Sequence, residues 1–320
     1  MNSPTARALP PLALILILAT APSFASDAPD FNDAFWKQWG DGQAELSSYD
    51  LTFPRYGQLR SGTAITVFVT ETFSQEARVK ADPGRHAEAD QYPVMKLNLM
   101  QDFPTGIYDY NVMTSAFYAI TSRQGRPAGS PTKVAFSSQE WCGHAFHELL
   151  PGVRDVRSVS HSYFDGEGDQ TRDLPYPPNS LFEDGLLHWA RGWATPVLKP
   201  GESRTVPLLR STEFVRFRHV PLMWEDAVLH RSEAKQTITV PGGTFEVETL
   251  EVTVQGDEAR RWTFQVEAAA PRRIVRWETD EGRRAELVKS DRMKYWAMNG
   301  PEFVDQVSRL GLSPRPARTP

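Results

Sequence analysis

The residues best suited to chemistry gather in one short stretch, Ser137 to Glu148. This stretch contains the only cysteine of the chain, Cys142, and two of its seven histidines, His144 and His147. Two carboxylates, Glu140 and Glu148, lie beside them. Thiol, imidazole and carboxylate groups together suggest nucleophilic catalysis or metal binding, and the two alternatives require different local structures.

Nucleophilic catalysis would use Cys142, because a thiolate is populated near neutral pH only beside a base or a positive charge. His144 is two residues away, and on an extended strand such residues share a face. Glu140 would lie on the same face and orient the imidazole. The alternative is a buried thiol that packs beside Trp141 as a small apolar residue. We expect the buried thiol, because a free cysteine in an exported protein is safest away from oxidants.

Metal binding would use His144, His147 and Glu148. The two histidines are three residues apart and would share one face of a helix, with a third ligand from His161 or His188. Their order differs from the H-E-x-x-H motif of metalloproteases. The chain has no glycine-rich phosphate loop and no G-x-S-x-G elbow, and the sequence predicts no cofactor.

The elements that position these residues are mainly strands. Residues 63–70, 247–254 and 261–267 are rich in β-branched or alternating apolar side chains, and turn residues recur about every ten positions. We expect a strand over 133–141 that delivers the reactive stretch. The sequence predicts a mainly β fold, a curled antiparallel sheet in a sandwich or half-open barrel, with two or three short helices.

Short helices are expected at 30–39, at 180–192 and after Gly300. Ser180 and Glu183 have the spacing of a capping box. Trp189 and Trp193 follow on the apolar side of that helix. They would close one mouth of the sheet and, with Trp141, contact a ligand.

The first 25 residues have the layout of a secretory signal peptide. One arginine precedes the apolar run 12–19, and small residues at Ser23 and Ala25 suit cleavage after Ala25. No cysteine follows the run, so a lipoprotein is not expected, and no later segment is apolar for long enough to span a bilayer. We expect a periplasmic or secreted protein.

The remaining chain reads as one mainly β domain over 26–311 with a disordered tail at 312–320. Two β subdomains, 43–175 and 203–296, joined by the helix near 180–192, are the alternative. One cysteine forms no internal disulfide, and a chain of this length buries a core without one. The formal net charge of −5 disfavours non-specific nucleic-acid binding.

Residues 236–290 contain a glycine turn, an aromatic strand, a proline before a strand and a final strand ending in Glu-Leu. These are Val240-Pro241-Gly242-Gly243-Thr244-Phe245, Trp262-Thr263-Phe264, Ala270-Pro271-Arg272-Arg273-Ile274-Val275 and Ala285-Glu286-Leu287. In these motifs the segment resembles an uncharacterised family of exported bacterial proteins, the DUF3108-like periplasmic β proteins. The resemblance implies a periplasmic, curled antiparallel sheet, somewhat like lipoprotein-carrier folds, and it brings no catalytic residues.

The sequence favours a periplasmic protein that binds a lipid or another envelope component without catalysis. A curled sheet encloses an apolar cavity when it closes or half closes. The alternatives are a hydrolase or transferase that depends on Cys142 and His144, and a metal protein that uses His144, His147 and Glu148.

Overall fold

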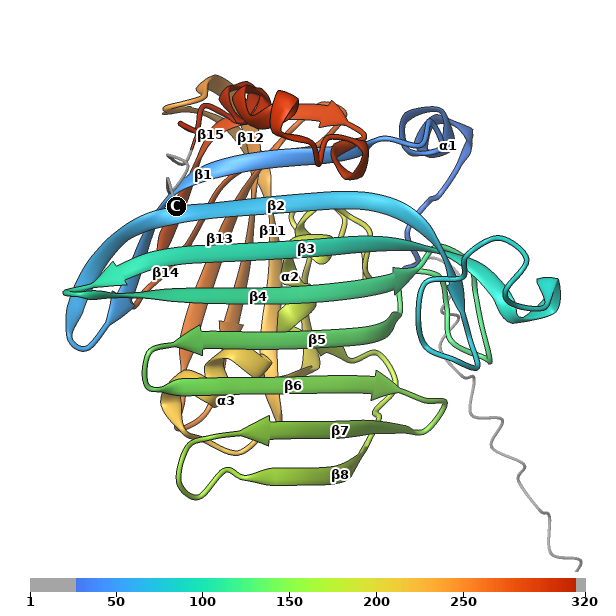
Figure 1. Cartoon of the computed structure of the whole chain (residues 1–320). Helices are drawn as coiled ribbons and strands as arrows, with labels where there is room; N and C mark the ends of the chain where they lie inside the picture. Colours follow the sequence, from blue (N-terminus) through green and yellow to red (C-terminus); the bar gives the residue numbers. More distant parts are fainter. Residues whose placement is uncertain (1–26, 315–320) are drawn as a thin grey trace, which may run out of the picture.

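A computed structural model describes residues 27–314 of the chain. The signal peptide expected at 1–25 lies outside the described residues. Fifteen strands form one sheet in the described part (Figure 1). The mainly β prediction is confirmed.

The first eight strands form a continuous meander. Their bounds are β1 Ala44–Arg55, β2 Gln58–Ser74, β3 Gln91–Thr105, β4 Tyr108–Ala119, β5 Pro131–Glu140, β6 Gly143–Pro151, β7 Asp155–Ser162 and β8 Asp169–Pro175. The other seven complete the sheet. Their bounds are β9 Leu181–Phe182, β10 Ser203–Leu209, β11 Trp224–Val240, β12 Gly243–Val254, β13 Arg260–Glu267, β14 Ile274–Thr279 and β15 Arg284–Met293.

The sheet order joins the two ranges that the sequence left as possible subdomains. It runs β8-β7-β6-β5-β4-β3-β2-β1-β15-β14-β13-β12-β11-β10-β9. β1 pairs antiparallel with both β2 and β15, and only the β9–β10 pair is parallel. The strands of 43–175 and 203–296 therefore belong to one sheet.

The two edge strands of the curled sheet are β8 and β9. They approach each other where the ring centroids of Tyr176, after β8, and Phe182, in β9, lie 5.7 Å apart. The indole Nε1 of Trp224, at the start of β11, donates to the carbonyl oxygen of Pro175 at the end of β8 over 2.8 Å. The ring of Trp224 also stacks on Tyr176, with centroids 6.2 Å apart. These contacts connect the two ends of the curled sheet, which do not pair as strands. The architecture is therefore that of a half-open barrel.

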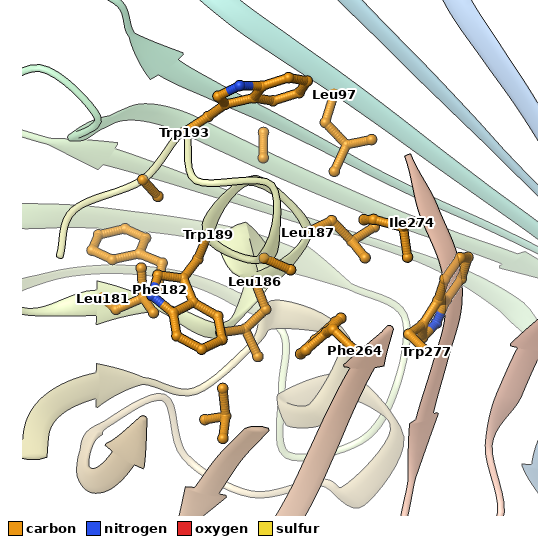
Figure 2. Close-up of a cluster of buried hydrophobic side chains, with 14 of the residues drawn as sticks. Leu97, Leu181, Phe182, Leu186, Leu187, Trp189, Trp193, Phe264, Ile274 and Trp277 are labelled. Atoms are coloured by element: carbon orange, nitrogen blue, oxygen red, sulfur yellow. The ribbon is translucent and has the colours of Figure 1, made fainter. Parts of the chain in front are cut away.

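The inner face of the sheet is packed with apolar side chains. In β12, Leu250, Val252 and Val254 are buried while the residues between them are partly exposed, as expected for a strand with one face in the core. α2 (Leu186–Ala190) lies inside the curl, and its leucines point toward Phe264 and Trp277 on the opposite wall (Figure 2). Around α2, the space enclosed by the curled sheet is therefore filled by the hydrophobic core.

The expected helix at 180–192 is wrong in extent and in its cap. Leu181 and Phe182 pair with β10 as β9, η3 (Glu183–Gly185) follows, and α2 is only five residues long. The hydroxyl of Ser180 donates to the carbonyl oxygen of Pro177. Glu183 does not reach back to Ser180, because Arg260 and Trp262 hold its carboxylate from the sheet.

The two terminal helices form where expected. α1 (Asp33–Trp39) begins at Asn32, whose side chain accepts from two backbone amides. η5 (Pro301–Leu310) is a 3₁₀-helix that ends at Gly311 in the left-handed conformation. Leu312, in the expected disordered tail, packs against a small cluster around Leu310, and residues 315–320 lie outside the described chain.

Two other short 3₁₀ turns are present, η2 (Glu88–Asp90) and η4 (Tyr295–Ala297). α3 (Thr212–Arg218) was not expected from the sequence. Ser211 caps this helix by accepting from the amide of Phe214. No helix within residues 27–314 is long and apolar enough to cross a membrane.

Candidate functional site

The reactive stretch forms a tight hairpin in which Cys142 occupies the turn. β5 ends at Glu140, β6 begins at Gly143, and Trp141 and Cys142 connect them. The thiol is exposed. The prediction of a buried, packing cysteine is therefore wrong, because the chain turns one residue earlier than the sequence pattern indicated.

The grouping of Cys142, His144 and Glu140 on one strand face is also wrong. His144 is exposed and pairs across the hairpin with Gln139. Glu140 points the other way and is 8% exposed, and its Oε1 accepts from Nη2 of Arg216 over 3.1 Å. The turn thus separates the thiol and imidazole from the carboxylate expected to orient them.

The proposed metal ligands are separated by the same geometry. On a strand, residues three apart face opposite sides, so His147 is buried while His144 is exposed. Glu148 pairs with Nζ of Lys133 at 2.6 Å. Across residues 27–314, no three His, Cys, Asp or Glu side chains are grouped as a metal site.

The three tryptophans proposed as ligand contacts have unlike environments. Trp141 is 72% exposed at the hairpin tip. Trp189 is buried, and its Nε1 donates to the carbonyl oxygen of Pro196. Trp193 is buried, with the guanidinium of Arg191 4.0 Å from its ring centroid. Trp189 and Trp193 belong to the core (Figure 2), and neither lines a mouth of the sheet.

Two pockets flank α3, which lies at the end of the sheet where the β5–β6 hairpin turns (Figure 1). Val215, Arg216 and His219 face the first pocket. Phe214, Phe217 and Arg218 face the second. We name them the His147 pocket and the Arg55 pocket after a residue in each.

The His147 pocket has a volume of about 200 Å³ and lies between β5–β8 and α3. Nε2 of His147 is 2.8 Å from Oγ of Ser158 on the neighbouring strand. Burial, with a smaller effect of the Arg172 charge, lowers the pKa of His147 to about 4. The imidazole is therefore neutral at physiological pH.

Charged groups line the same pocket on the α3 side. Nδ1 of His219 is 2.7 Å from Oε1 of Glu167. Arg216 is buried with its guanidinium carbon 3.4 Å from the centroid of Phe164. Burial lowers the pKa of Arg216, although the charges of Glu167 and Glu140 oppose this. Glu140 and Glu167 thus lie at ion-pair distance from Arg216.

The Arg55 pocket is larger, about 310 Å³. It forms where the β1–β2 turn meets α3 and the strands β13 to β15. Its apolar lining consists of aromatic rings, and its polar lining consists mainly of arginines and two glutamates. The lining side chains include Phe53, Arg55, Tyr56, Phe217, Arg218 and Arg283.

Arg55 is held in place by neutral groups. Its Nη2 donates to the hydroxyl of Tyr110 over 3.1 Å, and its Nη1 donates to the carbonyl oxygen of Phe217 over 3.4 Å. The guanidinium carbon lies 4.4 Å from the ring centroid of Tyr56 and 4.8 Å from that of Phe217. Within residues 27–314, no carboxylate lies at ion-pair distance from Arg55. The guanidinium is thus fixed in position without a counter-charge in contact.

The charge of Arg55 changes the acidity of its neighbour. Burial opposes ionisation of Tyr56, but hydrogen bonds from the hydroxyls of Tyr108 and Tyr110, together with the nearby Arg55, lower its pKa. The Tyr56 and Tyr110 hydroxyl oxygens are 2.6 Å apart. Tyr56 is thus the more acidic partner of this pair of hydroxyls, because burial raises the pKa of Tyr110.

The other three arginines of the pocket are paired. Arg218 contacts Glu281, Arg283 contacts Glu213, and Arg260 contacts Glu183 and Glu225. Glu213 also accepts from Nε2 of Gln101 over 2.6 Å. Among these four arginines, Arg55 carries the unbalanced positive charge, in a chain whose net charge is −5.

Most of these residues were not predicted from the sequence. For the His147 pocket a signal was present: Ser158, Ser160 and Ser162 occupy the phase of β7 that faces inward, where apolar residues are expected. Arg55 gave no comparable signal, because its neighbours Tyr110 and Phe217 are far from it in the sequence.

Comparisons with known proteins assign no function to the chain. No family model matches the chain, and no curated protein matches it. Among solved structures, the chain is similar to the β-barrel-like protein of the domain of unknown function DUF1849 from Brucella abortus. The two are 12% identical, with 78% of this chain and 98% of that chain covered and a TM-score of 0.45. That family differs from the DUF3108-like proteins that residues 236–290 resemble, and the resemblance to those proteins stays a prediction.

Proposed function

We propose that this protein binds an anionic amphiphile of the cell envelope in the Arg55 pocket and does not convert it chemically. The observation that carries the proposal is Arg55, a guanidinium fixed by neutral hydrogen-bond acceptors and aromatic rings with no carboxylate in contact. A carboxylate or phosphate matches the planar set of N–H donors that arginine presents.

The walls of the pocket suit the apolar part of such a ligand. Phe53, Phe214, Phe217 and Trp262 line it beside the charged groups. Small-molecule sites combine an apolar wall with a few polar groups that set the orientation, and they occur in the mouths of β-barrels. A ligand with one anionic group and a short apolar chain satisfies both parts.

Binding is favoured over catalysis by the state of the candidate nucleophiles. Cys142 lies in an exposed turn, and Glu140, its expected partner, pairs with Arg216 instead. The pKa of His147, lowered to about 4, makes it a weak general base for Ser158 near neutral pH.

The expected signal peptide supports a periplasmic location for this binding. The DUF3108-like resemblance of residues 236–290 supports the same compartment. We therefore place the ligand among the lipids or other amphipathic molecules of the envelope.

Calorimetric titration with decyl phosphate, decanoate and decanol tests the proposal. The two anions should bind more tightly than decanol. Arg55→Gln should weaken anion binding at least about ten-fold, because a hydrogen bond to a charged group contributes about 1.5–3 kcal/mol. Decanol binding should change little.

Arg261→Gln is the matched control. Arg261 is exposed on β13, lies 3.9 Å from Glu251 and does not line the pocket. It should leave all three affinities unchanged. Equal binding of decanol and the anions, or anion binding unaffected by Arg55→Gln in a folded variant, would refute the proposal.

A further inference from the structure

One end of the sheet carries a row of exposed apolar side chains, one at each successive hairpin tip. The β1–β2, β3–β4, β5–β6 and β7–β8 turns all lie at this end (Figure 1). Tyr56 is 56% exposed, Ile107 84%, Trp141 72% and Tyr163 75%. We call these four residues the tip row. Exposed apolar groups that recur in one place generally mark an interaction surface.

The tip row is continuous through side-chain contacts. The hydroxyl of Tyr108 donates to that of Tyr56 over 3.5 Å, and the Tyr108 ring lies 6.2 Å from the ring of Trp141. The ring of Tyr163 packs over Gly143, where a β-carbon would lie 2.4 Å from a ring carbon. Gly143 thus allows Tyr163 to lie close beside the β5–β6 tip.

Two other turns at this end of the sheet are acidic and lack aromatic residues. The register of β1 with β15 and of β12 with β13 places the turns at 255–259 and 280–283 at the same end. These turns contain Asp257, Glu258, Asp280 and Glu281 and no aromatic residue. The four residues of the tip row all lie in the half of the sheet built from β1 to β8, and the β10–β11 connection at the same end exposes Met223.

We propose that the tip row docks on the surface of a lipid bilayer with net-neutral headgroups. Tryptophan and tyrosine are the residues that concentrate at the membrane–water interface. Isoleucine, at the most exposed tip, suits the acyl region. Separate tips enter a fluid surface individually, whereas a protein partner would have to offer a pocket for each.

The charge near the tips selects the headgroup. The four turns contain no lysine, and Asp165, Glu167 and Asp169 surround the fourth tip. These carboxylates disfavour an anionic lipid surface and attract the amine of a zwitterionic headgroup, which aromatic faces also bind. Docking should therefore depend on apolar contact and vary little with salt.

The docking surface is continuous with the Arg55 pocket, because Tyr56 belongs to both. The inference that the bilayer supplies the amphiphile rests on the proposed function, whereas the docking itself does not. A pocket beside the docked edge lets an amphiphile pass between bilayer and protein over a short distance.

Flotation with phosphatidylcholine vesicles tests the docking. The unmodified protein should float with the vesicles at low and at high salt. Ile107→Ser combined with Trp141→Ser should weaken the partition by about ten-fold or more, because both side chains would lose the apolar contact with the bilayer.

The control changes two exposed valines at the opposite end of the sheet. Val79 is 46% exposed in the β2–β3 loop and Val153 50% in the β6–β7 turn. Val79→Ser combined with Val153→Ser should leave flotation unchanged. Absence of flotation for the unmodified protein, equal loss in this control, or flotation only with anionic lipid would each overturn the proposal.

Two more measurements separate membrane docking from ligand binding and from self-association. Arg55→Gln should float normally, and the tip variant should still bind decyl phosphate in solution, so failure of docking is distinguishable from failure of the pocket. If light scattering instead showed a dimer that the tip variant abolishes, the row would be a contact between copies of this chain and the membrane assignment would be wrong.

Discussion

At the scale of single residues, Asp184 is a buried carboxylic acid whose pKa is strongly raised. It lies in η3, and its carboxylate accepts from the amide and the hydroxyl of Thr212 at the start of α3. Burial raises its pKa to about 7, although the hydrogen bonds from Thr212 oppose the shift, and the charges of Glu183 and Glu213 add to it. Asp184 thus links η3 to α3, and its buried environment favours the protonated carboxylic acid.

Asp184→Asn should therefore stabilise the protein at alkaline pH. The folded pKa lies above the unfolded value of 3.8, so the folded state loses stability as pH rises from about 4 to about 7 and the full cost persists above that. An asparagine keeps an oxygen that accepts from Thr212 and carries no charge. Urea unfolding at pH 8 should show a gain of a few kcal/mol that shrinks at pH 5; an equal effect at both pH values would contradict the assignment.

At the scale of elements, a buried ion pair ties the segment after α2 to the sheet. Nη1 of Arg191 is 2.5 Å from Oε1 of Glu45 on β1, and its Nη2 donates to the carbonyl oxygen of Pro271. The guanidinium also lies 4.6 Å from the ring centroid of Phe68. Because Glu45 and Arg191 are both buried, each charge depends on the other.

Arg191→Met should destabilise the fold by about 3–5 kcal/mol, because it leaves the Glu45 carboxylate buried without a partner. The double change Arg191→Met with Glu45→Gln should cost less than the single one. Urea unfolding measures both. The control is Arg284→Met, which breaks the exposed pair with Glu278 and should cost less than about 1 kcal/mol. A double variant as unstable as the sum of its single changes would contradict the coupling.

At the scale of the whole molecule, two buried neutral histidines make the fold sensitive to acid. Burial lowers the pKa of His188 to about 3, against a hydrogen bond to the carbonyl oxygen of Met95 that raises it. His147 is lowered to about 4 by burial. His188 connects α2 to β3 in the core, and His147 lies in the pocket beside α3.

Stability should fall as pH drops from about 6.5 toward 4, because the unfolded chain binds protons at these histidines before the folded one does. Asp184 works in the opposite direction over the same range, and two histidines outweigh one carboxylate. His188→Gln, which keeps a donor for Met95, should flatten the acid limb of a plot of unfolding free energy against pH. An unchanged limb in a folded variant would show that His188 does not carry the effect.

The sequence by itself determined the class of the fold, because strand alternation and turn residues are local signals. The alternation of β12 and β13 and a short helix within 30–39 were recognisable without any long-range information.

Tertiary structure decided the site. A difference of one residue in where β5 turns moved Cys142 from a buried strand into an exposed tip and placed Glu140 on the opposite face from His144. The capping box predicted at 180–183 does not form, because the carboxylate of Glu183 accepts from the guanidinium of Arg260 in the sheet instead. Arg55 belongs to a pocket only because α3, more than a hundred residues away in the sequence, packs beside it and accepts a hydrogen bond from its guanidinium. Local periodicity in the sequence does not reveal such long-range contacts.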